Sequence, residues 1–96
     1  MELPALREDL NRSYGLDLPE TPGIDALTVV LAERINAMIT ADFNRLVSLL
    51  YRIDVSEAKL KNLLRENSGV DAGLLIARLI LERQWQKIET RRKYRS

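Results

Sequence analysis

An apolar row with helical spacing crosses the middle of the chain. Its members recur at steps of three or four residues, the stagger that places side chains on one face of an α-helix. They are Leu31, Ile35, Ile39, Phe43, Leu46, Leu50 and Ile53. No Pro or Gly lies between Gly23 and Gly69. The row therefore predicts one long helix, over Asp25–Arg52, whose apolar face needs a partner surface.

Composition predicts an all-α fold. The 96 residues are near the low end of what one self-sufficient core needs. Hydrophobic residues make up 46% of the chain and charged residues 30%, which is typical of a folded protein. Of the four Gly and three Pro, only Gly69 and Gly73 lie beyond residue 23. Helix breakers are therefore concentrated at the N-terminal end.

Residues 1–23 are expected to form a short helix followed by a loop. The apolar residues Leu3, Leu6, Leu10 and Tyr14 fall on one helical face. Pro4 suits a first helical turn, and Gly15 suits a C-terminal cap. Two prolines in the following segment indicate the loop.

Residues 24–96 are expected to form a helical domain of three helices, in the order long, short, long. Asp25 is a suitable N-cap for the long helix. Asp54, with Glu57 three residues later, resembles a capping box for the short one. Gly69 is expected to end that helix in the left-handed conformation. Asp71 then caps a last helix that runs to about residue 92.

The length of the first of these helices favours a homodimer. A helix of 28 residues would span about 42 Å, whereas a compact globule of this size has a radius of gyration of about 12–13 Å. Part of the apolar row would then be left bare unless a second chain covered it. The candidate interface consists of Leu31, Ile35, Ile39, Phe43, Leu46, Leu74, Leu81 and Trp85. The alternative is a kink near Thr40–Asp42, which would fold the helix in two and close the monomer.

The residue inventory excludes several kinds of chemistry. The chain contains no Cys and no His. Disulfides and thiolate chemistry are therefore absent, as are zinc and haem sites that depend on these ligands. No histidine is present to titrate near neutral pH. We accordingly expect no catalytic, cofactor or metal site and no enzymatic activity.

Two charged residues lie in apolar surroundings and are candidates for a pair. On a continuous helix, Asp42 falls inside the apolar arc, and Arg78 lies within the most apolar octet of the chain. Because isolated buried charges are costly, a bridge between the two would fix the helix register. The alternatives are a ligand-binding charge pair and a pair of Arg78 with Glu82 along one helix.

The C-terminal end is basic. Between Arg83 and Ser96 there are six Lys or Arg residues against one Glu. Arg91, Arg92, Lys93 and Arg95 are candidate phosphate-binding residues. The alternative is a solvated helix end, where cations are favoured by the macrodipole.

One segment resembles a group of small bacterial proteins with no assigned activity. The resemblance rests on residues 49–57, of sequence Leu-Leu-Tyr-Arg-Ile-Asp-Val-Ser-Glu, then on Leu60 and on Glu82-Arg83-Gln84. It covers roughly residues 30–90, and it implies an all-helical fold with no site to transfer.

Together these patterns predict a non-enzymatic helical interaction or oligomerisation protein. The alternative function is a nucleic-acid-associated accessory protein that uses the basic end. The first residues lack the features of a signal peptide, and no apolar stretch reaches the roughly 20 residues of a membrane span. We therefore expect a cytoplasmic protein without a membrane partner.

Overall fold

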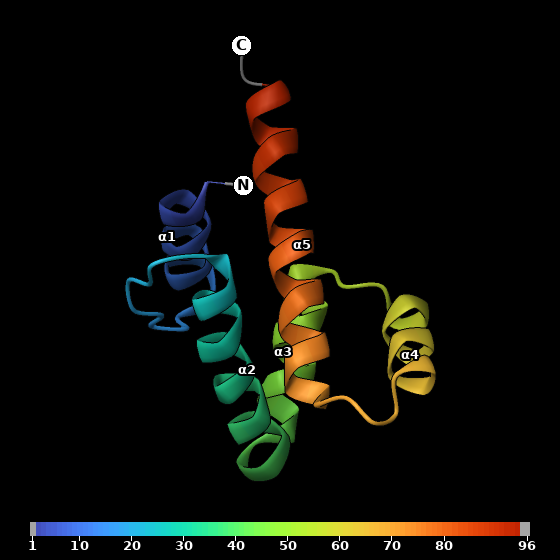
Figure 1. Cartoon of the computed structure of the whole chain (residues 1–96). Helices are drawn as coiled ribbons and strands as arrows, with labels where there is room; N and C mark the ends of the chain where they lie inside the picture. The colour runs from blue at the N-terminus through green and yellow to red at the C-terminus, as the bar shows by residue number, and fades with distance from the viewer. Residues whose placement is uncertain (1, 95–96) are drawn as a thin grey trace.

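The computed structural model describes residues 2–94, and it confirms the all-α prediction. The described residues form five helices and no strand. The helices are α1 (Leu3–Tyr14), α2 (Ile24–Ala41), α3 (Phe43–Ile53), α4 (Glu57–Glu66) and α5 (Ala72–Lys93), as Figure 1 shows. None of them is long and apolar enough to cross a membrane.

The predicted long helix is wrong, because it breaks at Asp42 into α2 and α3. Asp42 has a non-helical backbone, with φ −154° and ψ 71°. Its amide donates to the Met38 carbonyl and closes α2, while its carboxylate accepts from the Arg45 amide at 3.2 Å and opens α3. In Figure 1, α2 descends to this break and α3 returns beside α5. The kink near Thr40–Asp42 is therefore the correct alternative, and the body has four helices instead of three.

Two predicted caps are confirmed. Gly15 ends α1 in the left-handed region, at φ 61°, and its amide donates to the Asn11 carbonyl. The Asp71 carboxylate accepts from the Gly73 amide at 2.8 Å and also from the Leu74 amide, and so begins α5. Both ends follow from local chemistry that does not depend on distant packing.

Three other predicted caps are wrong. Asp54 lies in the left-handed region at φ 66° and ends α3, so the Ser56 hydroxyl caps α4 by accepting from the Lys59 amide. Gly69 is not left-handed, because α4 already ends at Asn67, whose side chain donates to the Leu63 carbonyl.

At the start of α2 the N-cap position belongs to Gly23. Asp25 instead lies in the first helical turn, where a negative charge suits the positive end of the helix dipole.

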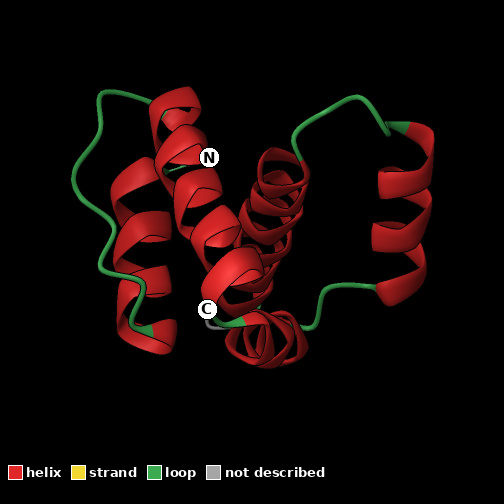
Figure 2. Ribbon diagram, turned by 90° about the horizontal axis from the view of Figure 1, so that it is seen from below, coloured by secondary structure: helices red, strands yellow, loops and turns green. Residues whose placement is uncertain are grey.

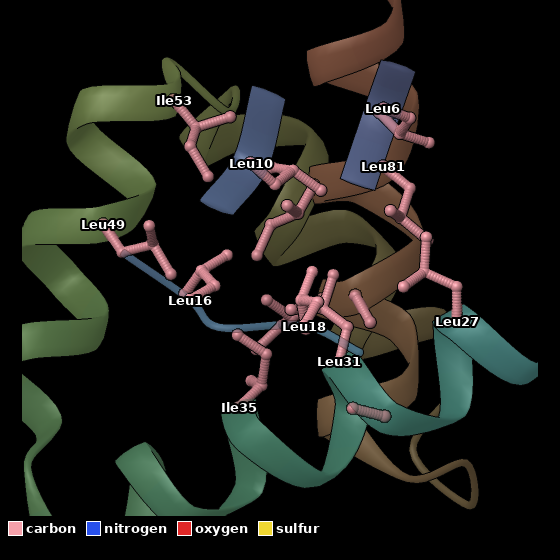
Figure 3. Close-up of a cluster of buried hydrophobic side chains, with 14 of the residues drawn as sticks. Leu6, Leu10, Leu16, Leu18, Leu27, Leu31, Ile35, Leu49, Ile53 and Leu81 are labelled. Carbon is pink, nitrogen blue, oxygen red and sulfur yellow. The ribbon is translucent and has the colours of Figure 1, made fainter. Parts of the chain in front are cut away.

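One hydrophobic core joins α1, the loop after it, α2, α3 and α5. Figure 3 shows its leucine and isoleucine side chains converging from these segments. Its most deeply buried members include Leu6 and Leu10 of α1, Leu27, Leu31 and Ile35 of α2, Leu46 and Ile53 of α3, and Ile80 of α5. The loop adds Leu16 and Leu18, so the core crosses the boundary at residue 23 that composition suggests.

The break in the long helix changes the argument for a dimer. The radius of gyration is 13.2 Å, close to the expectation for a compact chain of this length. Because α2 and α3 fold back on α5, one chain covers most of the apolar row by itself. A long overhanging helix therefore no longer supplies a reason for two chains to associate.

The helix α4 lies to one side of this core. Figure 2 shows it at the edge of the molecule, joined by a loop at each end. None of its residues is buried, and Leu60, Leu63 and Leu64 are only half-buried. An exposed ion pair between Lys59 Nζ and Glu82 Oε1, at 2.9 Å, joins it to α5.

Candidate functional site

Most residues of the predicted interface lie inside the single chain. Leu31, Ile35, Leu46 and Leu81 are buried in the core. The half-buried Ile39, Leu74 and Trp85 pack against that core. Because the chain itself covers these side chains, they leave little surface for a second chain. The candidate interface is therefore wrong for these seven residues. Only Phe43 is mainly exposed.

The structure does not bring Asp42 and Arg78 together. Both side chains are exposed, and neither takes part in an ion pair within residues 2–94. The helix break places Asp42 at a junction, where its carboxylate caps α3. The predicted pair depended on a continuous helix and is therefore wrong. The alternative pair with Glu82 is also absent, because Glu82 binds Lys59.

The outer face of α3 carries an exposed apolar row that we call the α3 row. It consists of Phe43, Val47 and Tyr51, whose exposed fractions are 58%, 50% and 86%. The three residues are spaced by four and therefore share one side of the helix. From the sequence, Phe43 belongs to the predicted interface, whereas Val47 and Tyr51 are not among its residues. The spacing of Phe43, Val47 and Tyr51 at steps of four is the sequence pattern that indicates a shared helix face.

The buried side of α3 explains why this row is left outside. Leu46, Leu49 and Ile53 are buried and fix that side of the helix against the core. Asn44 and Ser48, both exposed, border the α3 row with small uncharged side chains. A helix of a globular chain normally presents charged residues to solvent, so this surface is unusual.

A buried polar network joins α1 to α5. Asp9 and Gln84 are only 6% and 3% exposed. The Gln84 amide nitrogen donates to the Asp9 carboxylate, and the Tyr14 hydroxyl donates to Gln84 Oε1 at 3.2 Å. Arg91 completes the network with an ion pair to Asp9 at 2.7 Å. Within the described residues, no buried side-chain N or O lacks a hydrogen-bond partner.

The basic C-terminal end is partly engaged within the chain. Arg91 binds Asp9, and Arg92 binds Glu2 while its guanidinium lies 5.4 Å from the centre of the Trp85 ring. Lys93 is exposed. Arg95 lies outside the described residues. The two arginines therefore attach α5 to the N-terminal segment, and they do not form a free arm.

The comparisons with known proteins add no family. No protein-family model, curated protein sequence or solved structure matches this chain. The resemblance to small bacterial proteins stays a prediction. Among the residues that the structure describes, no cluster of three or more acidic side chains is placed to hold a metal ion.

Proposed function

We propose that this chain is a non-enzymatic helical interaction protein that forms a homodimer through the α3 row. The observation that carries the proposal is the exposure of Phe43, Val47 and Tyr51 on one side of a helix whose other side is buried. Apolar side chains gathered on one exposed helix face favour association with a second apolar surface.

A second copy of the chain is the occupant that the pattern fits. Val47 lies midway between two aromatic residues of the row. If two α3 helices pair antiparallel about a two-fold axis, Val47 meets its own copy and Phe43 meets Tyr51 of the partner subunit. Aromatic pairs of this kind add to the energy of apolar burial.

The charges around α3 are compatible with this pairing. The only charged residues between Asp42 and Asp54 are Arg45 and Arg52. Arg52 is turned toward α1, where its guanidinium donates to the Ser13 carbonyl at 2.8 Å and lies 5.2 Å from the Tyr14 ring centre. It therefore brings no like charge to the axis.

The size of the row predicts a weak dimer. From Phe43 to Tyr51 the helix rises about 12 Å, and a standard stable interface buries about 800 Å² on each partner. The row alone supplies a small part of such an interface. We therefore expect a monomer–dimer equilibrium in the micromolar to millimolar range.

Sedimentation equilibrium of matched variants tests the proposal. The wild type should move from 11.0 kDa toward twice that mass as concentration rises. Val47→Glu should stay monomeric, because two carboxylates would face each other on the axis. Val29→Glu is the control, since Val29 of α2 is 52% exposed and lies outside the row. A wild type that remains monomeric at millimolar concentration, or equal effects of both variants, would disprove the proposal.

A charge-swap experiment tests the antiparallel arrangement. Phe43→Lys and Tyr51→Glu should each weaken the dimer. The double variant should regain association, because each introduced lysine would meet an introduced carboxylate across the axis. Failure of the double variant to regain association would rule out this pairing of the two helices.

A further inference from the structure

Three residues on one side of α5 are all positively charged. Arg83, Lys87 and Arg91 are spaced by four, so their side chains are neighbours along α5. Like charges at this spacing repel one another. Arg83 is compensated by Asp54 at 3.2 Å, and Arg91 is compensated by Asp9.

Lys87 has no carboxylate partner within residues 2–94. Its ammonium donates to the Tyr14 hydroxyl at 3.4 Å and to the Arg52 carbonyl at 3.3 Å. Both are neutral acceptors at the ends of neighbouring helices. The side chain is half-buried, and these two hydrogen bonds hold its charge in place without an ion-pair partner in the described residues.

The surface around Lys87 is hollowed. A depression of about 440 Å³, open to solvent, lies between the end of α1 and the second half of α5. The three cations line it, together with the hydroxyl-bearing residues Ser13, Tyr14 and Thr90. Its one carboxylate, Asp9, is buried and already accepts from Gln84 and Arg91.

We propose that this depression binds the phosphate group of a small organic phosphate, with Lys87 as its principal ligand. A phosphate dianion presents several oxygens, which suit an ammonium flanked by guanidinium and hydroxyl donors. The depression has room beyond the phosphate for an organic group. None of the residues that line the depression belongs to the α3 row.

A small ligand fits this site better than a nucleic acid. Nucleic-acid binding depends on neutralising several successive phosphates. Here Arg83 and Arg91 are already paired with carboxylates, so Lys87 is the one cation of the row without an acidic partner in the described residues. One such charge in this depression suits one phosphate group.

Titration followed by amide NMR tests the site, with phenyl phosphate and inorganic phosphate as probes. Saturable shifts are expected at residues 13–14 and 87–91. Lys87→Gln should weaken binding by about tenfold or more, because it removes a charge-assisted contact. Lys61→Gln is the matched control, since Lys61 is an exposed lysine of α4 paired with Glu57 at 3.0 Å. It should bind like the wild type.

A gain-of-affinity variant keeps the test decisive if Lys87→Gln does not fold. Thr90 is exposed at the edge of the depression, so Thr90→Lys should fold and should bind phenyl phosphate several-fold more tightly. The proposal is overturned by an absence of saturable shifts, by equal losses in the Lys87 and Lys61 variants, or by a Thr90→Lys variant that does not gain affinity. Binding of a single-stranded RNA without binding of either probe would also overturn it.

Discussion

Asp71 connects two helices through one carboxylate. Its Oδ1 accepts from the Gly73 amide at 2.8 Å and from Asn36 Nδ2 at 2.9 Å. The first bond caps α5, and the second ties that cap to α2. The Asn36 bond is the main cause that lowers the pKa of Asp71 below its ordinary value of 3.8, and the Leu74 and Gly73 amides add to it. Folding therefore favours the ionised carboxylate.

This pKa shift predicts a pH dependence of stability. Because the pKa of Asp71 is lower in the folded state, the unfolded state binds more protons around and below pH 3.8. The stabilisation is present above that pH and is lost as the pH falls through the folded-state pKa. Urea unfolding from about pH 3 to pH 6 should give a shallower pH slope for Asp71→Asn than for the wild type. Identical slopes would contradict the prediction.

Gly73 lies where α5 passes closest to Asn36. A Cβ added to Gly73 would lie 2.5 Å from Cγ and Oδ1 of the Asn36 side chain. Real Cβ atoms do not come so close, and Asn36 is held by Asp71. The helix requires a glycine here because of this contact and not because of its backbone angles.

Gly73→Ala is therefore expected to destabilise the fold by about 1–2 kcal/mol, despite the better helix propensity of alanine. In an Asn36→Ala background the clash is gone, and the same substitution should be neutral or stabilising. A double-mutant cycle measured by urea unfolding checks this. Additive effects of the two substitutions would show that the contact is not the cause.

At the scale of helices, the sequence predicts α1 and α5 more accurately than the segment that contains α2 and α3. The C-terminal end of α1 and the start of α5 rest on Gly15 and Asp71, whose capping hydrogen bonds are local. From the sequence, the break at Asp42 is only the alternative to a continuous helix, because steps of three and four continue across it. An Asp that precedes an apolar run by one residue is also a helix start signal, and here that signal outweighed the periodicity.

Periodicity along a single helix also fails to predict the exposed side of α3 and the surroundings of Lys87. The helical wheel that places Asp42 inside the apolar arc assumes an unbroken helix, so it also places Phe43 on the same face as Leu46. Once α3 begins at Phe43, its buried side is set by Leu46, Leu49 and Ile53. Lys87 and its acceptors Tyr14 and Arg52 belong to three different helices. Single-helix patterns contain no information on such a grouping.

The helix α4 should be the least stable element of the molecule. None of its ten residues is buried, and an exposed ion pair contributes little to stability. Local opening requires the loss of few apolar contacts. In hydrogen exchange, the amides of α4 should therefore exchange faster than those in the centres of α2 and α5. Equal protection of α4 and α5 would mean that α4 opens only when the whole chain unfolds.

At the scale of the whole molecule, the N-terminal segment is part of the core. Leu6, Leu10, Leu16 and Leu18 are all buried. The Asn11 side chain holds the loop against α1, because it donates to the Leu18 carbonyl and accepts from the Leu18 amide. The polar network of Asp9 and Gln84 adds a second attachment on α5. A division of the chain at residue 23 would separate the four leucines from the rest of the core and Asp9 from Gln84.

A fragment of residues 24–96 is therefore expected not to fold on its own. Full burial of a leucine side chain contributes about 1.5–3 kcal/mol, so four of them contribute roughly as much as the whole stability of a small domain. Thermal unfolding of the fragment, followed by circular dichroism, should show no cooperative transition. Its helix content should fall well below that of the full chain.

Addition of a peptide of residues 1–23 distinguishes lost contacts from a misfolded fragment. If the four leucines stabilise the fold by completing the core, the peptide should restore a cooperative transition whose midpoint rises with peptide concentration. A peptide with Leu6→Ala and Leu10→Ala should restore less, because two of the most deeply buried side chains are removed. A fragment that unfolds cooperatively without the peptide would instead show that residues 24–96 are a domain of their own.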